Sequence, residues 1–167
     1  MIQSLLSREV EKRPKLVRLT GRILFLAEAP EFVRSQLEGH DLDPQAIPPL
    51  RDNISTDEMT PAYICYHFDE TLGDFIYLGL KCGDEFPVKR GDVKRGGFVA
   101  SVAGKRRGKG SSREQSPYAE IAAGIKLVIA ENIERIYKQN CQNLGLLTST
   151  DFGLIPRIAA GEEISLE

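Results

Sequence analysis

The sequence predicts an α/β fold built on a mainly parallel β-sheet. Residues 97–104 and 125–130 are short apolar runs rich in β-branched residues, typical of buried strands, and 144–150 begins one more strand or loop. Helical patterns at 118–124 and 132–145 separate these runs. Strands and helices that alternate over about 50 residues are typical of right-handed parallel crossover units.

The first half of the chain predicts shorter elements. Its first 15 residues are polar and charged, as in a tail or a frayed helix. Residues 16–27 predict one or two short strands, and 30–49 predict a short helix followed by a loop. The aromatic and β-branched runs 63–68 and 75–80 predict two further strands.

Glycine and proline mark the ends of the later elements. Residues 81–97 contain four glycines and a proline and predict a loop. Ser116 and Pro117 resemble the N-cap and first position of a helix that ends at Gly124, and Gly145 closes the helix after it. The apolar positions of that last helix are Ile133, Ile136, Tyr137, Cys141 and Leu144.

Length and composition indicate one ordinary domain. The chain has 167 residues, 41% of them hydrophobic and 28% charged. We assign 1–15 to an N-terminal tail, 16–160 to one domain, and 161–167 to a linker start or tag remnant, because that ending shows no clear terminal element. No apolar run approaches the ~20 residues of a membrane helix, and the N-terminus is charged too early for a secretory signal. We therefore expect a cytoplasmic protein without a membrane partner.

The cysteines do not predict a metal site within this chain. Cys65, Cys82 and Cys141 lie far apart, without a CxxC pair, and the two histidines lack metal-ligand spacing. An odd, unclustered set suits a reducing compartment. We interpret all three cysteines as packing or incidental residues.

Basic charge is concentrated in residues 89–113. This segment has a single acid, Asp92, and the remainder of the chain has a net charge of −10. Its nine basic residues are Lys89, Arg90, Lys94, Arg95, Lys105, Arg106, Arg107, Lys109 and Arg113. Local basic charge in an acidic protein favours a specific anion over nucleic acid, and no aromatic residues interleave the basic ones.

The glycine-rich turn 104–114 (GKRRGKGSSRE) is the candidate site. It leaves the carboxyl end of a predicted strand, where ligands usually bind in such units. Its glycines allow close backbone approach, and Ser111, Ser112 and Arg113 add hydroxyls and a planar guanidinium suited to a carboxylate or phosphate. The spacing is not that of a Walker A loop. A small anion pocket and a solvated basic turn with a capping serine both fit this pattern.

Two motifs resemble the swivel domain of the aconitase and isopropylmalate isomerase family. GSSRE, with the helix after it, KLVIA and YKQNCQNLGLL, is similar to one conserved region of that domain, and DNISTDEMTP is similar to its early loop. The resemblance covers roughly residues 50–150. It implies a swivelling β/β/α three-layer domain, in which an antiparallel layer joins the mainly parallel central sheet. In two-subunit members this domain is a separate small subunit.

The resemblance also implies a chemistry, the dehydration and rehydration of a hydroxy-di- or tricarboxylate by a hydro-lyase or isomerase. A 4Fe-4S cluster on the catalytic core, expected here on a partner subunit or on the rest of a longer chain, acts as the Lewis acid. The swivel domain closes over that core. The roles carried over are a serine base at Ser111, a site-organising carboxylate at Asp57, and substrate binding by Thr56, Gly110, Ser112 and Arg113.

Departures from the family in the early loop and around the glycine-rich turn affect the expected substrate. Glu58 and Met59 stand where aconitases carry His and Ile, and no arginine lies between Arg51 and Arg90, so we do not expect citrate. Gln115 replaces a histidine. The very basic KRRGK run would suit extra negative charge on the substrate, including a phosphonate-like group.

Other interpretations remain open for the same residues. Ser55 and Glu58 fit a helix capping box, with Pro61 ending the helix. The aromatic residues of 63–77 either line a specificity pocket or, as we favour, pack in strands: Tyr63, Tyr66, Phe68, Phe75 and Tyr77. The function alternatives are a non-catalytic anion-binding or regulatory module and an RNA-binding module.

Overall fold

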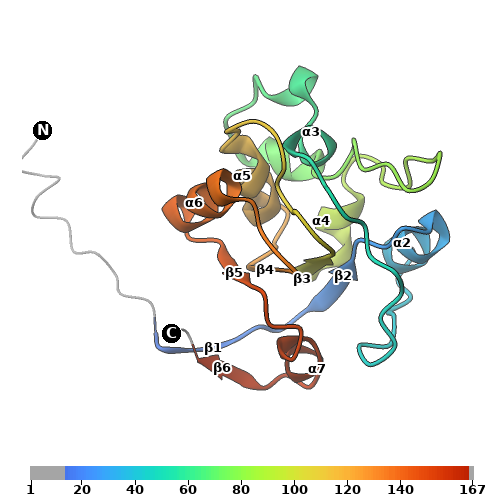
Figure 1. Cartoon of the computed structure of the whole chain (residues 1–167), viewed down its shortest axis with the longest axis vertical. Helices are drawn as coiled ribbons and strands as arrows, with labels where there is room; N and C mark the ends of the chain where they lie inside the picture. Colours follow the sequence, from blue (N-terminus) through green and yellow to red (C-terminus); the bar gives the residue numbers. More distant parts are fainter. Residues whose placement is uncertain (1–13, 166–167) are drawn as a thin grey trace, which may run out of the picture.

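The centre of the molecule is a four-stranded parallel sheet with strand order β2-β3-β4-β5 (Figure 1). The computed structural model describes residues 14–165. The strands are β2 (Arg22–Phe25), β3 (Phe98–Ala103), β4 (Leu127–Ala130) and β5 (Leu147–Ser149). The predicted α/β class is therefore confirmed, and so are the strands predicted in 16–27, 97–104, 125–130 and 144–150.

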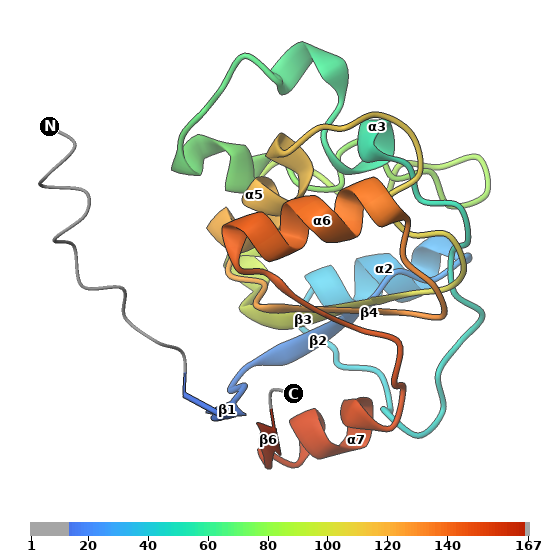
Figure 2. The ribbon, with the colours of Figure 1, turned by 60° about the vertical axis from the view of Figure 1, so that its left-hand side comes forward.

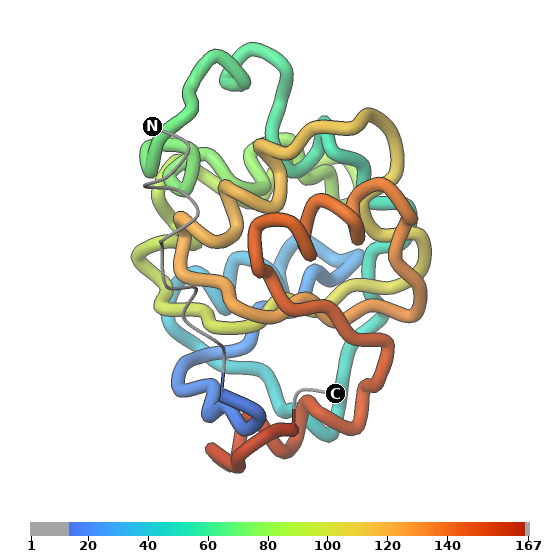
Figure 3. The backbone as a smooth tube through the Cα atoms, turned by 90° about the vertical axis from the view of Figure 1, so that its left-hand side faces the viewer, coloured from blue at the N-terminus to red at the C-terminus, as the bar shows by residue number. Residues whose placement is uncertain are grey.

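A small antiparallel sheet joins the two ends of the described chain. Strand β1 (Leu16–Arg18) pairs with β6 (Glu163–Ser165), and Val17 lies opposite Ile164. Figure 3 shows the blue tube of β1 beside the dark red tube of β6. We had assigned this C-terminal segment to a linker or tag remnant without a terminal element. Residues 163–165 do form a terminal element, β6, in which Ile164 is buried and paired, while the linker or tag assignment stays a prediction.

The helices lie on both faces of the parallel sheet (Figure 2). They are α2 (Pro30–Leu37), α3 (Thr56–Met59), α4 (Asp92–Gly96), α5 (Gln115–Ala122), α6 (Arg135–Leu144) and α7 (Leu154–Ala159), with 3-10 helices η1 (Ala62–Ile64) and η2 (Glu70–Asp74). Helix α7 and the β1–β6 pair lie on one face and α2, α5 and α6 on the other. Within residues 14–165, no helix has the length and apolar character needed to cross a bilayer.

The core consists of two apolar clusters separated by the parallel sheet. Every residue of β3 and β4 is buried, as expected for central strands covered on both faces. Along β2, Leu24 contributes to the cluster under α5 and α6, whereas Ile23 and Phe25 contribute to the cluster with α7. Burial of this kind contributes roughly 25 cal/mol per Å² of apolar surface to the free energy of folding. The core therefore stabilises the sheet, including the end of β3 from which the candidate site extends.

The two aromatic strands predicted at 63–68 and 75–80 are wrong. The first segment contains the end of η1 and a turn, and the second forms a bend and a turn after η2. Tyr63, Tyr66 and Phe68 are 68%, 72% and 78% exposed, so the expected strand packing of these rings is also wrong. Tyr77 is buried, but its positive φ of 63° takes it out of the extended region. Both segments have strand propensity, but among the described residues neither pairs with a strand.

Helix boundaries differ from the prediction in smaller ways. Helix α5 begins at Gln115 with Glu114 as its N-cap, so Ser116 is not the cap. Ser116 is instead buried, with its hydroxyl 2.7 Å from that of Thr60. Helix α4 interrupts the loop predicted at 81–97. In α6, Tyr137 and Cys141 are buried as predicted, whereas Ile136 is 52% exposed. The left-handed Gly145 ends α6 as predicted.

Candidate functional site

The candidate site is the loop 104–114, which leaves the carboxyl end of β3 and passes beside α3 (Figure 2). Backbone hydrogen bonds join it to the segment before and within α3. The amide of Asn53 donates to the carbonyl of Lys105 at 2.7 Å, and the amide of Thr56 donates to that of Lys109 at 2.9 Å. Two segments about 50 residues apart in sequence therefore form one surface.

A capping box positions the early loop. The hydroxyl of Ser55 accepts from the amide of Glu58 at 3.1 Å, and the Glu58 carboxylate accepts from the Ser55 amide at 2.9 Å. The capping interpretation is thus confirmed, and α3 ends before Pro61 as expected. The box does not compete with a site role, because it holds Thr56 and Asp57 in the first turn, facing the loop.

Ser111 and Thr56 meet across the two segments. Their hydroxyl oxygens are 3.1 Å apart, and Thr56 is buried while Ser111 is exposed. A buried partner fixes the position of the exposed hydroxyl without covering it. The hydroxyl that we expected to react is therefore oriented and open to a ligand or to a second protein.

Arg113 already has a carboxylate partner. Its Nη1 donates to Asp57 and, at 3.3 Å, to the carbonyl oxygen of Thr60. The other edge of the guanidinium, Nε and Nη2, has no hydrogen-bond partner among residues 14–165. Arg113 can therefore present a two-nitrogen edge to an incoming carboxylate while Asp57 holds the opposite side.

The remaining predicted site residues lie in the same loop. Gly110 has φ +113°, and a Cβ there would lie 3.4 Å from the Thr56 hydroxyl, so the loop backbone passes close to α3. Ser112 is exposed, and its carbonyl accepts from the side chain of Asn140 at 3.2 Å. Asn140 lies within the quoted segment YKQNCQNLGLL, but no role was predicted for it from the sequence. It reaches the loop because α6 follows β4, the neighbour of β3 in the sheet.

The fold neutralises most of the basic segment. Six of its nine cations form ion pairs, the buried one being Arg107 with Glu120. The six pairs are Lys94–Asp74, Arg95–Asp92, Lys105–Glu131, Arg106–Glu134, Arg107–Glu120 and Arg113–Asp57. In the described part of the chain, Lys109 is exposed without an ion-pair partner. Of the local basic charge that favours an anion, the loop 104–114 therefore keeps Lys109 unpaired, while Arg113 shares its charge with Asp57.

A cavity of about 580 Å³ lies between the loop and the start of α6. Its volume is within the range of small-molecule sites. Its lining residues are Gly108, Gly110, Glu134, Arg135, Ile136, Gln139 and Asn140. Polar and charged side chains of α6 and two loop glycines therefore surround a space that could hold a small polar ligand.

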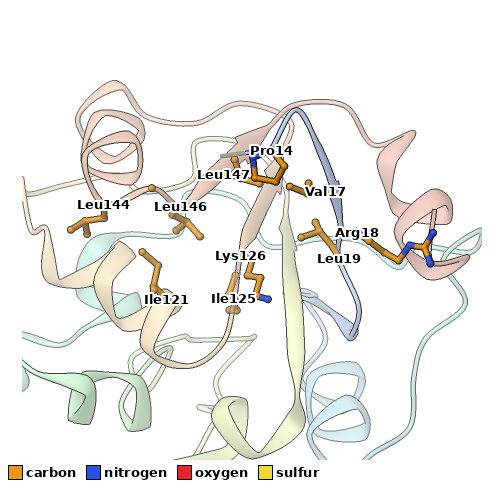
Figure 4. Close-up of a pocket in the computed structure, with 11 residues that line it drawn as sticks. Pro14, Val17, Arg18, Leu19, Ile121, Ile125, Lys126, Leu144, Leu146 and Leu147 are labelled. Carbon is orange, nitrogen blue, oxygen red and sulfur yellow. The ribbon is translucent and has the colours of Figure 1, made fainter. Parts of the chain in front are cut away.

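A second cavity lies at the opposite edge of the sheet (Figure 4). It measures about 380 Å³, and apolar side chains from β1, α5 and the start of β5 dominate its wall. Arg18 and Lys126 are its charged residues. Because its wall is mainly apolar and it brings together no group of hydroxyls or carboxylates, the candidate site is the loop and not this groove.

The cysteines do not form a ligand set. Burial raises the pKa of Cys82 to about 11 and that of Cys141 to about 12, so both remain protonated thiols at neutral pH. Iron–sulfur clusters are held by thiolates. No three His, Cys, Asp or Glu side chains gather into a metal-binding group anywhere in residues 14–165. This set does not fit a cluster.

Comparisons with known proteins agree with the family resemblance, and the family model covers the later motif. The family described as aconitase C-terminal domain matches residues 85–150. The isopropylmalate/citramalate isomerase small subunit of Methanocaldococcus jannaschii is 37% identical over 116 residues, which cover 69% of this chain and 65% of that protein. The 3-isopropylmalate dehydratase small subunit of Lachnospira eligens is 36% identical over 119 residues, which cover 71% of this chain and 68% of that one.

A solved structure is also similar over part of its length. The crystal structure of 3-isopropylmalate dehydratase from Methanocaldococcus jannaschii has 35% sequence identity and a TM-score of 0.48, over 58% of this chain and 55% of that chain. The matched region spans just under two thirds of the first curated relatives, 65% and 66% of their lengths.

Proposed function

Because the chain belongs to the aconitase C-terminal (swivel) domain family of the 3-isopropylmalate dehydratase small subunits, we propose that it acts as the swivel part of a hydro-lyase or isomerase. It closes over a partner that holds a 4Fe-4S cluster, binds a hydroxy-di- or tricarboxylate and supplies the base for dehydration and rehydration. The observation that carries this proposal is the contact of Ser111 with Thr56, since it joins the two motifs in one exposed site.

Ser111 is the proposed base. A free serine hydroxyl is a very poor base, so its alkoxide needs hydrogen-bond donors and positive charge around it. The Thr56 hydroxyl at 3.1 Å can donate to it, and Lys109 and Arg113 are the nearby cations in the loop. When the partner closes over this surface and excludes water, these interactions become stronger. Ser111 then takes a proton from the substrate carbon.

Arg113 is the proposed carboxylate binder. Its free Nε and Nη2 edge suits a bidentate contact, and Asp57 with the Thr60 carbonyl fixes the plane of the guanidinium. The hydroxyl of Ser112 and the backbone at Gly110 lie beside it in the loop. A fixed carboxylate orients the reacting carbon toward Ser111, and such positioning can contribute several kcal/mol to catalysis.

The cluster belongs on the partner in this proposal. The described cysteines do not suit it, because two of them are buried thiols of raised pKa and no ligand group is assembled. The chain's own contribution is therefore limited to binding, orientation and proton transfer. Its activity depends on a cluster-bearing large subunit or on such a core in the same polypeptide.

Reconstitution tests the proposal. The chain is mixed with a cluster-loaded large subunit of this family, and hydroxy-di- and tricarboxylates are screened for hydration and dehydration. We expect activity only in the mixture, and a loss of about 10²–10⁴-fold in kcat for Ser111→Ala. Ser35→Ala, on α2 and away from the loop, is the matched control and should keep full activity.

The same experiment separates the proposal from a non-catalytic anion-binding module. Such a module would leave turnover unchanged when Ser111 loses its hydroxyl, even if Arg113→Met abolished ligand binding. A Ser111→Ala mixture as active as wild type therefore refutes the proposed role of Ser111.

A further inference from the structure

A buried polar cluster lies directly under the candidate loop. Arg107, Tyr77, Glu120 and Ser101 are completely inaccessible to solvent, and Tyr137 is 1% exposed. They come from the loop itself and from β3, the turn after η2, α5 and α6. The cluster therefore connects the loop to four other parts of the fold. The proposed reaction makes no use of it.

The cluster is held by hydrogen bonds that converge on one carboxylate. Nη2 of Arg107 donates to Glu120, to the Tyr77 hydroxyl at 2.5 Å and to the Ser101 hydroxyl at 3.0 Å. The hydroxyls of Tyr77 and Tyr137 each donate to one oxygen of Glu120. Burial raises the pKa of both tyrosines, so they remain neutral donors.

Stability alone does not account for this pair. Burial costs several kcal/mol for each ion, and Nε and Nη1 of Arg107 have no hydrogen-bond partner among the described residues. Replacing such a pair by apolar residues of similar volume is often neutral or stabilising. The free-energy cost of burying this pair therefore indicates a role in positioning the backbone around it.

The backbone around Arg107 shows what that geometry is. Arg106 and Gly108 both have positive φ, 56° and 82°, which turns the side chain between them into the core. The carbonyl of Arg107 accepts from the Glu134 amide at 2.8 Å, at the start of α6. Gly108 lies flat on Tyr137, since a Cβ there would be 2.2 Å from the ring. The cluster thus sets where the loop leaves the core.

We infer that Arg107 is a positioning residue, which with Glu120 fixes the loop 104–114 against α5 and α6 and so holds Ser111 next to Thr56. Ser111 is only four positions away, and the amides of Gly108 and Lys109 both donate to the Ile54 carbonyl just before α3, so a shift at Arg107 is carried into this contact. The inference concerns the geometry of the loop, and it does not depend on which reaction Ser111 performs.

Hydrogen exchange of the full chain tests this directly. Arg107→Met and the double variant Arg107→Met/Glu120→Leu are compared with wild type by mass spectrometry. Loop amides such as those of Gly104 and Gly108 are hydrogen-bonded in wild type, and we expect them to exchange about tenfold faster or more in both variants. The double variant should stay folded and melt at a higher temperature than Arg107→Met, because it buries no lone charge.

Two further arms make the result decisive. Arg107→Lys keeps the charge and should restore part of the loop protection. In the reconstituted enzyme, Arg107→Met should lower kcat with little change in KM, because Arg113 remains held by Asp57 and Thr60. Arg157→Met, which breaks an exposed ion pair with Glu162 next to α7, is the control and should leave loop exchange unchanged.

Wild-type loop exchange in the double variant would overturn the inference. An unfolded double variant would overturn it too, because the pair would then be a requirement for stability. Both outcomes are read without any enzyme activity, so they remain distinct from a failure of the proposed function.

Discussion

Arg113 is held by Asp57 and Thr60 in the structure and is also the proposed binder of the substrate carboxylate. Its Nη1 is occupied by Asp57 and the Thr60 carbonyl, and its Nε and Nη2 have no hydrogen-bond partner among the described residues. Asp57 is therefore best described as the residue that orients Arg113. The family resemblance implied that Asp57 helps to organise the site, and orienting Arg113 is a more specific form of that role.

The cysteines give a prediction at the residue scale. Cys82 and Cys141 are buried, with pKa values raised by burial to about 11 and about 12 from an ordinary value of 9.0. Iodoacetamide at pH 8 should label Cys65 first and leave the other two intact, as read by peptide mass spectrometry. In denaturing urea all three should react, because their environments become alike.

The same pKa shifts predict how the free energy of unfolding depends on pH. The unfolded chain loses these two thiol protons first as the pH rises above about 9, so the unfolding free energy should fall there and not below it. Equal labelling of all three cysteines in the folded chain, or an unfolding free energy that is flat to pH 10.5, would contradict the buried environment.

At the element scale, a four-residue helix positions half of the site. Helix α3 is too short to be stable alone, and its capping box supplies the hydrogen bonds that its first amides need. Thr56 and Asp57 occupy its first two positions. The cap therefore contributes to stability and to the placement of the site residues.

Removing the cap tests this. Ser55→Ala should lower the free energy of unfolding by about 1 kcal/mol in urea denaturation. In the reconstituted enzyme it should also reduce kcat, since Thr56 then loses its fixed position. Ser35→Ala within α2 serves as the control, and an equal loss in both variants would argue against the capping role.

The two aromatic segments show where element prediction failed. Alternation and β-branched residues in 63–68 and 75–80 are real signals, but a strand also needs a partner edge. Tyr63, Tyr66 and Phe68 are instead exposed near the site, on the turn around η1. Gln115 contacts this turn, donating to the Cys65 carbonyl at 3.4 Å.

For the whole molecule, the β1–β6 pair joins the two ends of the described chain beneath the parallel sheet (Figure 3). Ile164 is 5% exposed and packs in the apolar cluster with Ile155 and Ile158 of α7. The site lies at the carboxyl ends of the parallel strands, whereas the apolar groove of Figure 4 lies at their amino ends.

This arrangement predicts that substitutions in the two strands of the antiparallel pair change the stability by unequal amounts. Ile164→Ala should destabilise the fold by about 2 kcal/mol, because a buried side chain is replaced by a cavity. Leu16→Ala, on the paired strand but 53% exposed, should cost much less. Urea denaturation of the two variants measures the difference, and equal values would mean that the antiparallel pair is not packed on the core.

Sequence patterns were sufficient for several features that depend on neighbours along the chain, although not for the N-cap of α5. The strand–helix alternation of the last third, the glycine at the end of α6 and the capping box of α3 all depend on local hydrogen bonds and periodicity. The loop 104–114 could be selected for the same reason, because it follows a buried strand and is rich in glycine. The motifs alone also pointed to the family.

Only the tertiary structure decided which charges remain free and which residues meet. Arg107 looks like its basic neighbours in the sequence, yet it is buried against Glu120, while Lys109 two residues later is exposed. Likewise the 3.1 Å contact of Ser111 with Thr56, and the pairing of β6 with β1, join residues far apart in the chain. Long-range contacts of this kind depend on the packing of several elements at once, and local propensity does not encode that packing.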